Sequence, residues 1–326
     1  MLHLRLITPA DRTEHVVDLI QHTVGTAHLV VLPGAARNPP GDVVMCDVAR
    51  EAADELLDGL RESGLERDGS IAVESIDLSL SKRADKAEKE APGEAADAVL
   101  WEELTEATHE ESTLSVTYLA FITLATMIAA CGVVLDNAIL IVGAMAVGPE
   151  FGPLAGIGTA LVRRAPRLAL RSVVALLAGF ALAMAVTVGF TLFMDACGLF
   201  TRAKLEAPRP NTNFVYAPDA FSFVVAVLAG AAGTLSLTSA KSGALIGVAI
   251  SVTTVPAAAN AAVALAYGDT GQTWGSTRQL LLNLFGIVLA GTLTLLAQKW
   301  FWARQRERNG RPTARALPGG PRRTRT

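Results

Sequence analysis

One apolar segment, residues 138–162, is long enough to cross a bilayer but is interrupted at its centre by GPEFGP (148–153). Pro149 and Pro153 each remove a backbone hydrogen-bond donor and crowd the preceding turn, so we do not expect a straight helix through them. Either half alone covers only about half of a ~30 Å hydrocarbon core. Glu150 is the only charged residue in the segment. A carboxylate at such a break marks a candidate functional site, and a kinked helix whose glutamate supports assembly is the alternative.

Five further runs without a charged residue surround this segment, and the chain as a whole is 51% hydrophobic. Each run is long enough for one membrane crossing. Together with the broken segment they predict six crossings within a membrane domain at residues 112–302. The five runs are residues 112–135, 172–194, 220–240, 242–268 and 279–298.

The distribution of Lys and Arg predicts the orientation of these crossings. Arg163, Arg164, Arg167 and Arg171 form a cluster without an acid, and Lys241 and an Arg-rich tail at 303–326 fall on the same side if there are six crossings. Short loops rich in Lys and Arg stay on the cytoplasmic side. We therefore expect a multi-pass protein of the plasma membrane with both termini in the cytoplasm. We expect a disordered tail with no nucleic-acid partner.

Residues 1–80 have the pattern of a small soluble domain. Strand-like and helix-like segments alternate in the order β-α-β-β-α-β, which predicts a ferredoxin-like unit. Such units serve as small-molecule sensors or as oligomerisation modules, but no pocket can be assigned here because the histidines lack ligand spacing. Residues 81–111 contain ten acids and four bases, which predicts a charged flexible linker followed by an amphipathic helix at the membrane surface.

The two halves of the membrane domain resemble each other. Residues 137–149 and 242–256 each follow a charged residue and lead to a proline near mid-span. With three crossings per half the second copy is inverted, and paired breaks in inverted halves indicate a midplane binding site; two ordinary kinked helices are the alternative. The predicted fold is thus an α-helical polytopic membrane protein of two inverted three-helix repeats with Pro-broken middle helices. The candidate solute or ion-binding residues are Gly148, Pro149, Glu150, Pro153, Thr253, Thr254, Pro256 and Asn260.

A second, smaller candidate site lies in a hydroxyl-rich cytoplasmic turn. Ser239, Lys241 and Ser242 could bind an anion such as phosphate, although a turn that ends a helix explains the same residues. Dense small residues, such as Gly152 and Gly156, allow helices to approach closely within one chain or between chains, so we expect a homo-oligomer.

Three stretches of the membrane domain resemble a known family. They are residues 115–135, GAMAVGPEFGP (143–153) and AGAAGTLSLTSAKSGALIGVAISVTTVPAAAN (229–260). The chain resembles, over residues 97–302, the hydrophobic membrane family known as domain of unknown function 389, including the lead-in LWEELTEATHEEST (100–113). The resemblance implies a polytopic bacterial membrane protein, often with an α/β domain before the membrane part. It implies no reaction, and many members have an apolar residue where this chain has Glu150.

Motifs of catalysis and nucleotide use are not found in the sequence. There is no GxxxxGK[ST] phosphate loop, no HExxH, no GxSxG and no CxxC among the three cysteines. We therefore expect neither an enzyme nor a metal or other cofactor. Two functions remain: a carrier or channel-like protein for a small solute or ion, or a membrane-anchored sensor or scaffold whose N-terminal domain binds a ligand or partner. An anchor alone has no need of a carboxylate at mid-bilayer, so Glu150 favours the first.

Overall fold

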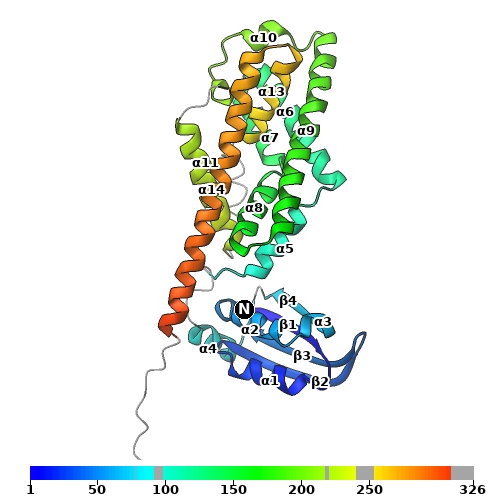
Figure 1. Cartoon of the computed structure of the whole chain (residues 1–326), viewed down its shortest axis with the longest axis vertical. Coiled ribbons are helices and arrows are strands. Elements are labelled where there is room, and N and C mark those ends of the chain that lie inside the picture. The colour runs from blue at the N-terminus through cyan, green and yellow to red at the C-terminus, as the bar shows by residue number, and fades with distance from the viewer. Residues whose placement is uncertain (77, 92–97, 217–219, 240–252, 310–326) are drawn as a thin grey trace, which may run out of the picture.

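The structure, a computed structural model, describes residues 1–76, 78–91, 98–216, 220–239 and 253–309, with side chains up to Arg304. A small α/β domain lies at one end of the molecule and a bundle of long helices extends away from it (Figure 1). Helix α5 (Trp101–Glu111) lies between the two parts.

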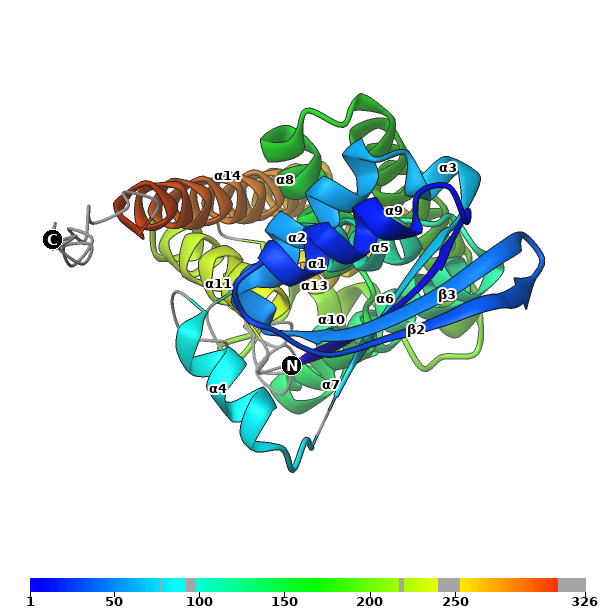
Figure 2. The ribbon, with the colours of Figure 1, turned by 90° about the horizontal axis from the view of Figure 1, so that it is seen from below.

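The N-terminal domain is a four-stranded antiparallel sheet with strand order β2-β3-β1-β4. Leu2, Leu4 and Leu6 alternate along β1 and bury their side chains against the helices, as the period of two in a strand requires. Figure 2 shows α1 and α2 on one side of the sheet and α4 on the other. The elements are β1 (Leu2–Thr8), α1 (Thr13–His22), β2 (Thr26–Arg37), β3 (Pro40–Val48), α2 (Arg50–Glu62), α3 (Leu65–Asp68) and β4 (Ser70–Ser75).

The segment after the sheet is more ordered than its charge predicts. Residues 82–90 form helix α4 (Lys82–Glu90), where the sequence predicts a flexible linker. The Ser81 side chain accepts hydrogen bonds from two N–H groups in the first turn, and Ala84 and Ala87 are buried against β2 and β3. Two alanines three residues apart give an otherwise charged helix one small apolar contact face, which explains the difference.

Helix α5 also departs from its predicted place. Its Leu104 is buried in a cluster with Val162 of α8 and Leu295 of α14 (Thr270–Asn309). The helix therefore packs against α8 (Phe151–Arg163) as part of the protein core, rather than facing only the membrane surface. The acids that the sequence places on its other side form ion pairs with both parts of the molecule, as described below.

Four helices of the membrane part are long and apolar enough to cross a bilayer, namely α6 (Val116–Val134), α9 (Pro166–Ala196), α11 (Ala220–Thr238) and α14. Helices α7 (Ala138–Val147) and α8 form a pair bent by 53°, which counts as one broken span or a re-entrant loop. Of the predicted crossing at 242–268, the structure describes only α13 (Thr254–Ala266). The described residues thus contain four or five spans, and residues 242–252 of the predicted crossing at 242–268 lie outside them.

The arginine cluster at 163–171 and the start of the predicted tail are more helical than their composition suggests. The arginine-rich loop is short, because α9 begins at Pro166 and places Arg167 and Arg171 on its first turns. Proline suits the first helical position, where the missing N–H would have no partner. Helix α14 continues to Asn309, seven residues into the predicted disordered tail, because residues 303–309 contain no helix breaker.

Glycines set the close contacts between the membrane helices. A Cβ on Gly156 of α8 would lie 2.5 Å from Ser172 Oγ and 2.6 Å from Ser112 Oγ, and a Cβ on Gly230 of α11 would lie 2.6 Å from the Ile287 carbonyl oxygen. These small residues therefore bring helices together within one chain. Helix α13 occupies the centre of the bundle, buried along nearly its whole length between α6, α9 and α14.

Candidate functional site

The N-termini of α8 and α13 meet inside the bundle. Glu150 is the residue before α8 and Thr254 is the first residue of α13. The Thr254 hydroxyl donates a 2.7 Å hydrogen bond to Glu150 Oε1. Gly148 packs directly against this carboxylate, and a Cβ there would collide with Glu150 Oε2 and lie 2.9 Å from Val255. The two breaks predicted from the sequence are therefore in contact, and their closeness requires glycine at 148.

The prolines have a different role from the one predicted. Pro153 is the third residue of α8 and Pro256 is the third residue of α13, and each helix has 13 residues. Proline is tolerated in the first turn, where its N–H would lack an intrahelical partner. Both prolines therefore begin a short helix instead of interrupting a long one. Only Pro149 lies in the non-helical segment between α7 and α8.

Glu150 is a buried carboxylate between two positive helix ends. Glu150 is only 5% exposed, and its Oε2 atom has no hydrogen-bond partner among the described residues. Each helix N-terminus carries a partial positive charge, so two of them favour a negative group at this point. A buried carboxylate with one free oxygen can accept a proton, a cation or a donor group of a solute.

Two amides of α14 complete the polar surroundings. Asn283 donates a 2.7 Å hydrogen bond to Thr253 Oγ1, and Gln279 lies 3.4 Å from the same oxygen. Both amides are 1% exposed and stand four residues apart on one helix face. Gln279 Oε1 and the Tyr118 hydroxyl are buried without a hydrogen-bond partner in the part of the chain that is described. Sequence reasoning missed Gln279 and Asn283, although two amides at this spacing in an apolar run are a readable signal.

Asn260 is not part of the group around Glu150, although the sequence analysis places it among the candidate binding residues. Its amide donates to Ser276 Oγ at 2.7 Å and its Oδ1 accepts from Arg209 Nη1 at 3.0 Å. Arg209 is only 4% exposed, also donates to Gln272, and its guanidinium lies 4.8 Å from the ring centre of Tyr216. These residues form a second buried polar cluster, which we call the Arg209 cluster, at the end of the bundle where α10 (Arg202–Glu206) lies (Figure 1).

The structure describes only part of the predicted anion site, and it gives one observation on metal binding. Of the secondary anion site, only Ser239 lies within the described residues, whereas Lys241 and Ser242 lie outside them. Within the described ranges, no group of three or more His, Cys, Asp or Glu side chains could hold a metal ion.

Comparison with known proteins identifies the membrane part. Residues 145–289, which include the Glu150–Thr254 contact and the Arg209 cluster, match the family described as Domain of unknown function (DUF389). This segment, 145 of the chain's 326 residues, is therefore similar to that family. The DUF389 match confirms the resemblance seen in the sequence over these residues, whereas the lead-in at 100–113 and the first span lie before it.

One curated relative is an uncharacterized protein of Methanocaldococcus jannaschii, which is 24% identical over 210 residues. The match covers 64% of this chain and 63% of that protein, so the chain spans less than two thirds of its relative's length. No solved structure matches the chain.

Proposed function

We propose that this protein is a carrier or channel-like transport protein for a small solute or ion, and not an enzyme. Its site is the point where α8 and α13 begin. The observation that carries this proposal is the buried Glu150 carboxylate, hydrogen-bonded by Thr254 across the two helix N-termini. Short helices that start at mid-depth and point their N-termini at one place form the substrate sites of many transporters.

An inverted repeat is part of this proposal. Helices α8 and α13 have equal length, begin with a proline at the same position, and each precede a long apolar helix, α9 and α14. Figure 1 shows α8 toward the N-terminal domain and α13 toward the opposite end of the bundle. Two such helices that start together and extend in opposite directions are the arrangement expected of inverted halves. The Arg209 cluster lies in the half that contains α13, and the hydrogen-bonded amides Gln279 and Asn283 lie beside the two helix N-termini.

The proposed orientation follows from the same arrangement. Arg163 ends α8 and pairs with Glu102 of α5, at the end of the bundle that faces the N-terminal domain. Arg171 on α9 contacts Thr113 and His109 at that end as well. Arginines gather on the cytoplasmic side of membrane proteins. We therefore place the N-terminal domain in the cytoplasm and the Arg209 cluster near the outer face of the plasma membrane.

Flux into proteoliposomes tests the proposal. Vesicles loaded with a pH-sensitive dye report proton movement, and light scattering reports the entry of a panel of inorganic ions and small neutral solutes. We expect Glu150→Gln either to abolish the flux that the wild-type protein supports or to change its pH dependence. The amide that replaces the carboxylate can neither exchange a proton nor neutralise a cation. Glu110→Gln, which changes an exposed carboxylate on α5, is the matched control. Flux that Glu150→Gln leaves unchanged would rule out a role for this site.

A membrane-anchored sensor is the second candidate. It is favoured by a cavity of about 680 Å³ that lies between the N-terminal sheet and α5. Cavities of this size suit small-molecule ligands. The two functions are compatible if the domain controls the transport path.

A further inference from the structure

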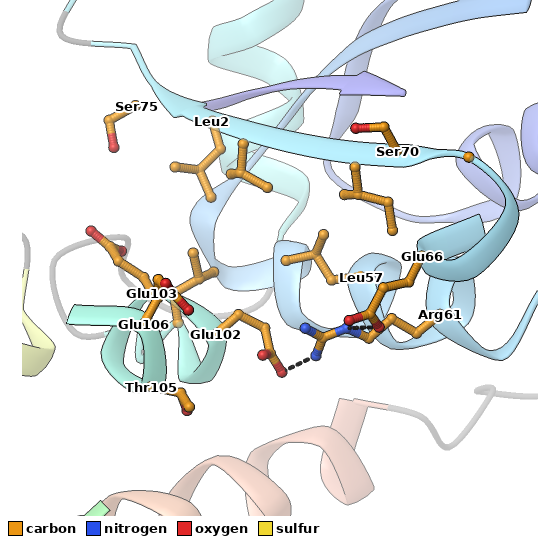
Figure 3. Close-up of a pocket in the computed structure, with 14 residues that line it drawn as sticks. Leu2, Leu57, Arg61, Glu66, Ser70, Ser75, Glu102, Glu103, Thr105 and Glu106 are labelled. Carbon is orange, nitrogen blue, oxygen red and sulfur yellow. Dashed lines mark ion pairs between the residues drawn. The ribbon is translucent and has the colours of Figure 1, made fainter. Parts of the chain in front are cut away.

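The cavity beside β4 results from the way the sheet is covered. Strand β4 is an edge strand paired with β1 only, and Ile71, Val73 and Ser75 stand opposite Leu6, Leu4 and Leu2 on the face that α1 and α2 cover elsewhere. Helix α5 lies opposite this face, and the cavity is the space between α5 and the sheet (Figure 3). The apolar part of its lining is Leu2, Leu57, Ile71, Val73 and Leu100.

The rest of the cavity lining is strongly acidic. It includes four glutamates and one arginine: Glu66, Glu102, Glu103, Glu106 and Arg61. Arg50 and Arg163 pair with Glu103 and Glu102, so one negative charge remains in excess. Arg61 pairs with Glu66 at 3.2 Å and with Glu102, as the dashed lines of Figure 3 mark, and Glu103 pairs with Arg50 at 2.7 Å. Glu106 has no ion pair among the described residues and shares the cavity with the Ser70 and Ser75 hydroxyls.

We propose that this cavity binds a small organic cation, an amine with an apolar body. Its apolar wall can take a hydrocarbon group out of water, and burial of such a group is favourable by about 25 cal/mol per Å². Its excess of carboxylates, with Glu106 unpaired, favours an ammonium group and disfavours an anion. An inorganic ion would leave the apolar wall unused.

Glu102 connects this site to the membrane part. Its carboxylate pairs with Arg61 of α2 and, at 2.9 Å, with Arg163, the last residue of α8. The other end of α8 begins at Glu150. An ammonium group in the cavity competes with Arg61 for the same carboxylates, so binding alters the contact that holds the end of α8. This consequence for transport rests on the proposed function, whereas the binding itself does not.

Calorimetric titration of the full-length protein in detergent micelles tests the binding. The probe is cyclohexylmethylamine, and the matched ligands are cyclohexylmethanol, which is neutral, and cyclohexanecarboxylate, which is negative. We expect the amine to bind at least tenfold more tightly than either. Glu106→Gln should weaken amine binding about two- to fivefold, as the loss of one exposed charge pair implies. Glu110→Gln, one turn further along α5 and outside the cavity, should leave the affinity unchanged.

Several outcomes would overturn the proposal. No binding of the amine, equal binding of amine and alcohol, or equal effects of Glu106→Gln and Glu110→Gln would each refute an organic-cation site. Both variants replace exposed side chains, so each should fold. Amine binding to the Glu150→Gln protein separates the two proposals, because Glu150 does not line the cavity: binding should persist there even if transport fails. Loss of binding in that variant would contradict an independent site.

Discussion

Replacing Thr254 with valine removes a hydroxyl that donates a hydrogen bond to Glu150 and keeps the shape of the side chain. Thr254 Oγ1 lies 2.7 Å from Glu150 Oε1, and both residues are buried. A hydrogen bond to a charged group contributes about 1.5–3 kcal/mol, and polar pairs in helical membrane proteins average about 0.6 and reach about 1.7 kcal/mol. We therefore expect Thr254→Val to lower the free energy of unfolding by about 1–2 kcal/mol.

The matched control is Thr159→Val on α8. Thr159 is fully buried, and its hydroxyl has no hydrogen-bond partner among the residues that the structure describes. Its replacement should change the free energy of unfolding by less than about 0.5 kcal/mol, or stabilise the protein, because no bond is lost. Equilibrium unfolding in mixed detergent micelles, followed by tryptophan fluorescence, measures both variants.

A double-mutant cycle of Thr254→Val with Glu150→Leu isolates the pair, because leucine removes both carboxylate oxygens and glutamine would keep an acceptor. We expect a coupling energy of about 1 kcal/mol, since the two groups share one hydrogen bond. Equal costs for the two valine variants, or a coupling energy below about 0.3 kcal/mol, would refute the idea that Glu150 is held by Thr254.

Three further predictions concern a carboxylate between the two domains, a buried arginine and a close helix contact. Burial raises the pKa of Glu102, but its two arginine partners outweigh this and hold the pKa below its ordinary value. The carboxylate therefore stabilises domain docking above the unfolded-state pKa of about 4.3, and this stability is lost as the pH falls through the folded-state value; protease cleavage between the domains should rise below about pH 4. Arg209→Gln should cost about 2–4 kcal/mol of unfolding free energy, because it removes a buried cation with two amide partners, whereas Arg202→Gln on an exposed helix should cost less than about 0.5; equal thermal shifts would contradict this. Gly156→Ala should destabilise by about 1–3 kcal/mol through overpacking, whereas Gly143→Ala, whose Cβ meets nothing within 4 Å, should be neutral or stabilising in the same assay.

Most of the coarse fold could be predicted from the long uncharged runs and from the alternation of apolar residues along β1. Four spans, the bent pair and the small antiparallel sheet follow from patterns of hydrophobicity, because a bilayer requires an apolar run of about 20 residues and a sheet imposes a period of two. Charge alone misplaces α4, since Ala84 and Ala87 contribute little to hydropathy yet give the helix its buried face. The position of α5 depends on contacts with α8 that are distant in sequence.

The candidate site is only partly readable from the sequence. Glu150 stands out because a lone charge in an apolar run is costly, and its contact with Thr254 follows from pairing the two breaks. Asn260 is misassigned because nothing local shows that Arg209, from a loop 51 residues away, enters the bundle to meet it. In the sequence, Arg209 looks like an ordinary exposed loop residue. Only the folded structure shows that it is buried.

Water access to the meeting point of α8 and α13 is the most direct test of the account. Single cysteines replace Thr253 at the meeting point, Leu177 on the outer face of α9 and Arg202 on the exposed α10, in a protein whose Cys131 and Cys197 are alanine. Cys46 can remain, because burial raises the pKa of its thiol to about 12 and keeps it unreactive. The account predicts that a membrane-impermeant thiol reagent labels positions 253 and 202 but not 177. Protection of position 253 at the level of 177 would contradict a hydrated transport site and leave Glu150 a structural residue.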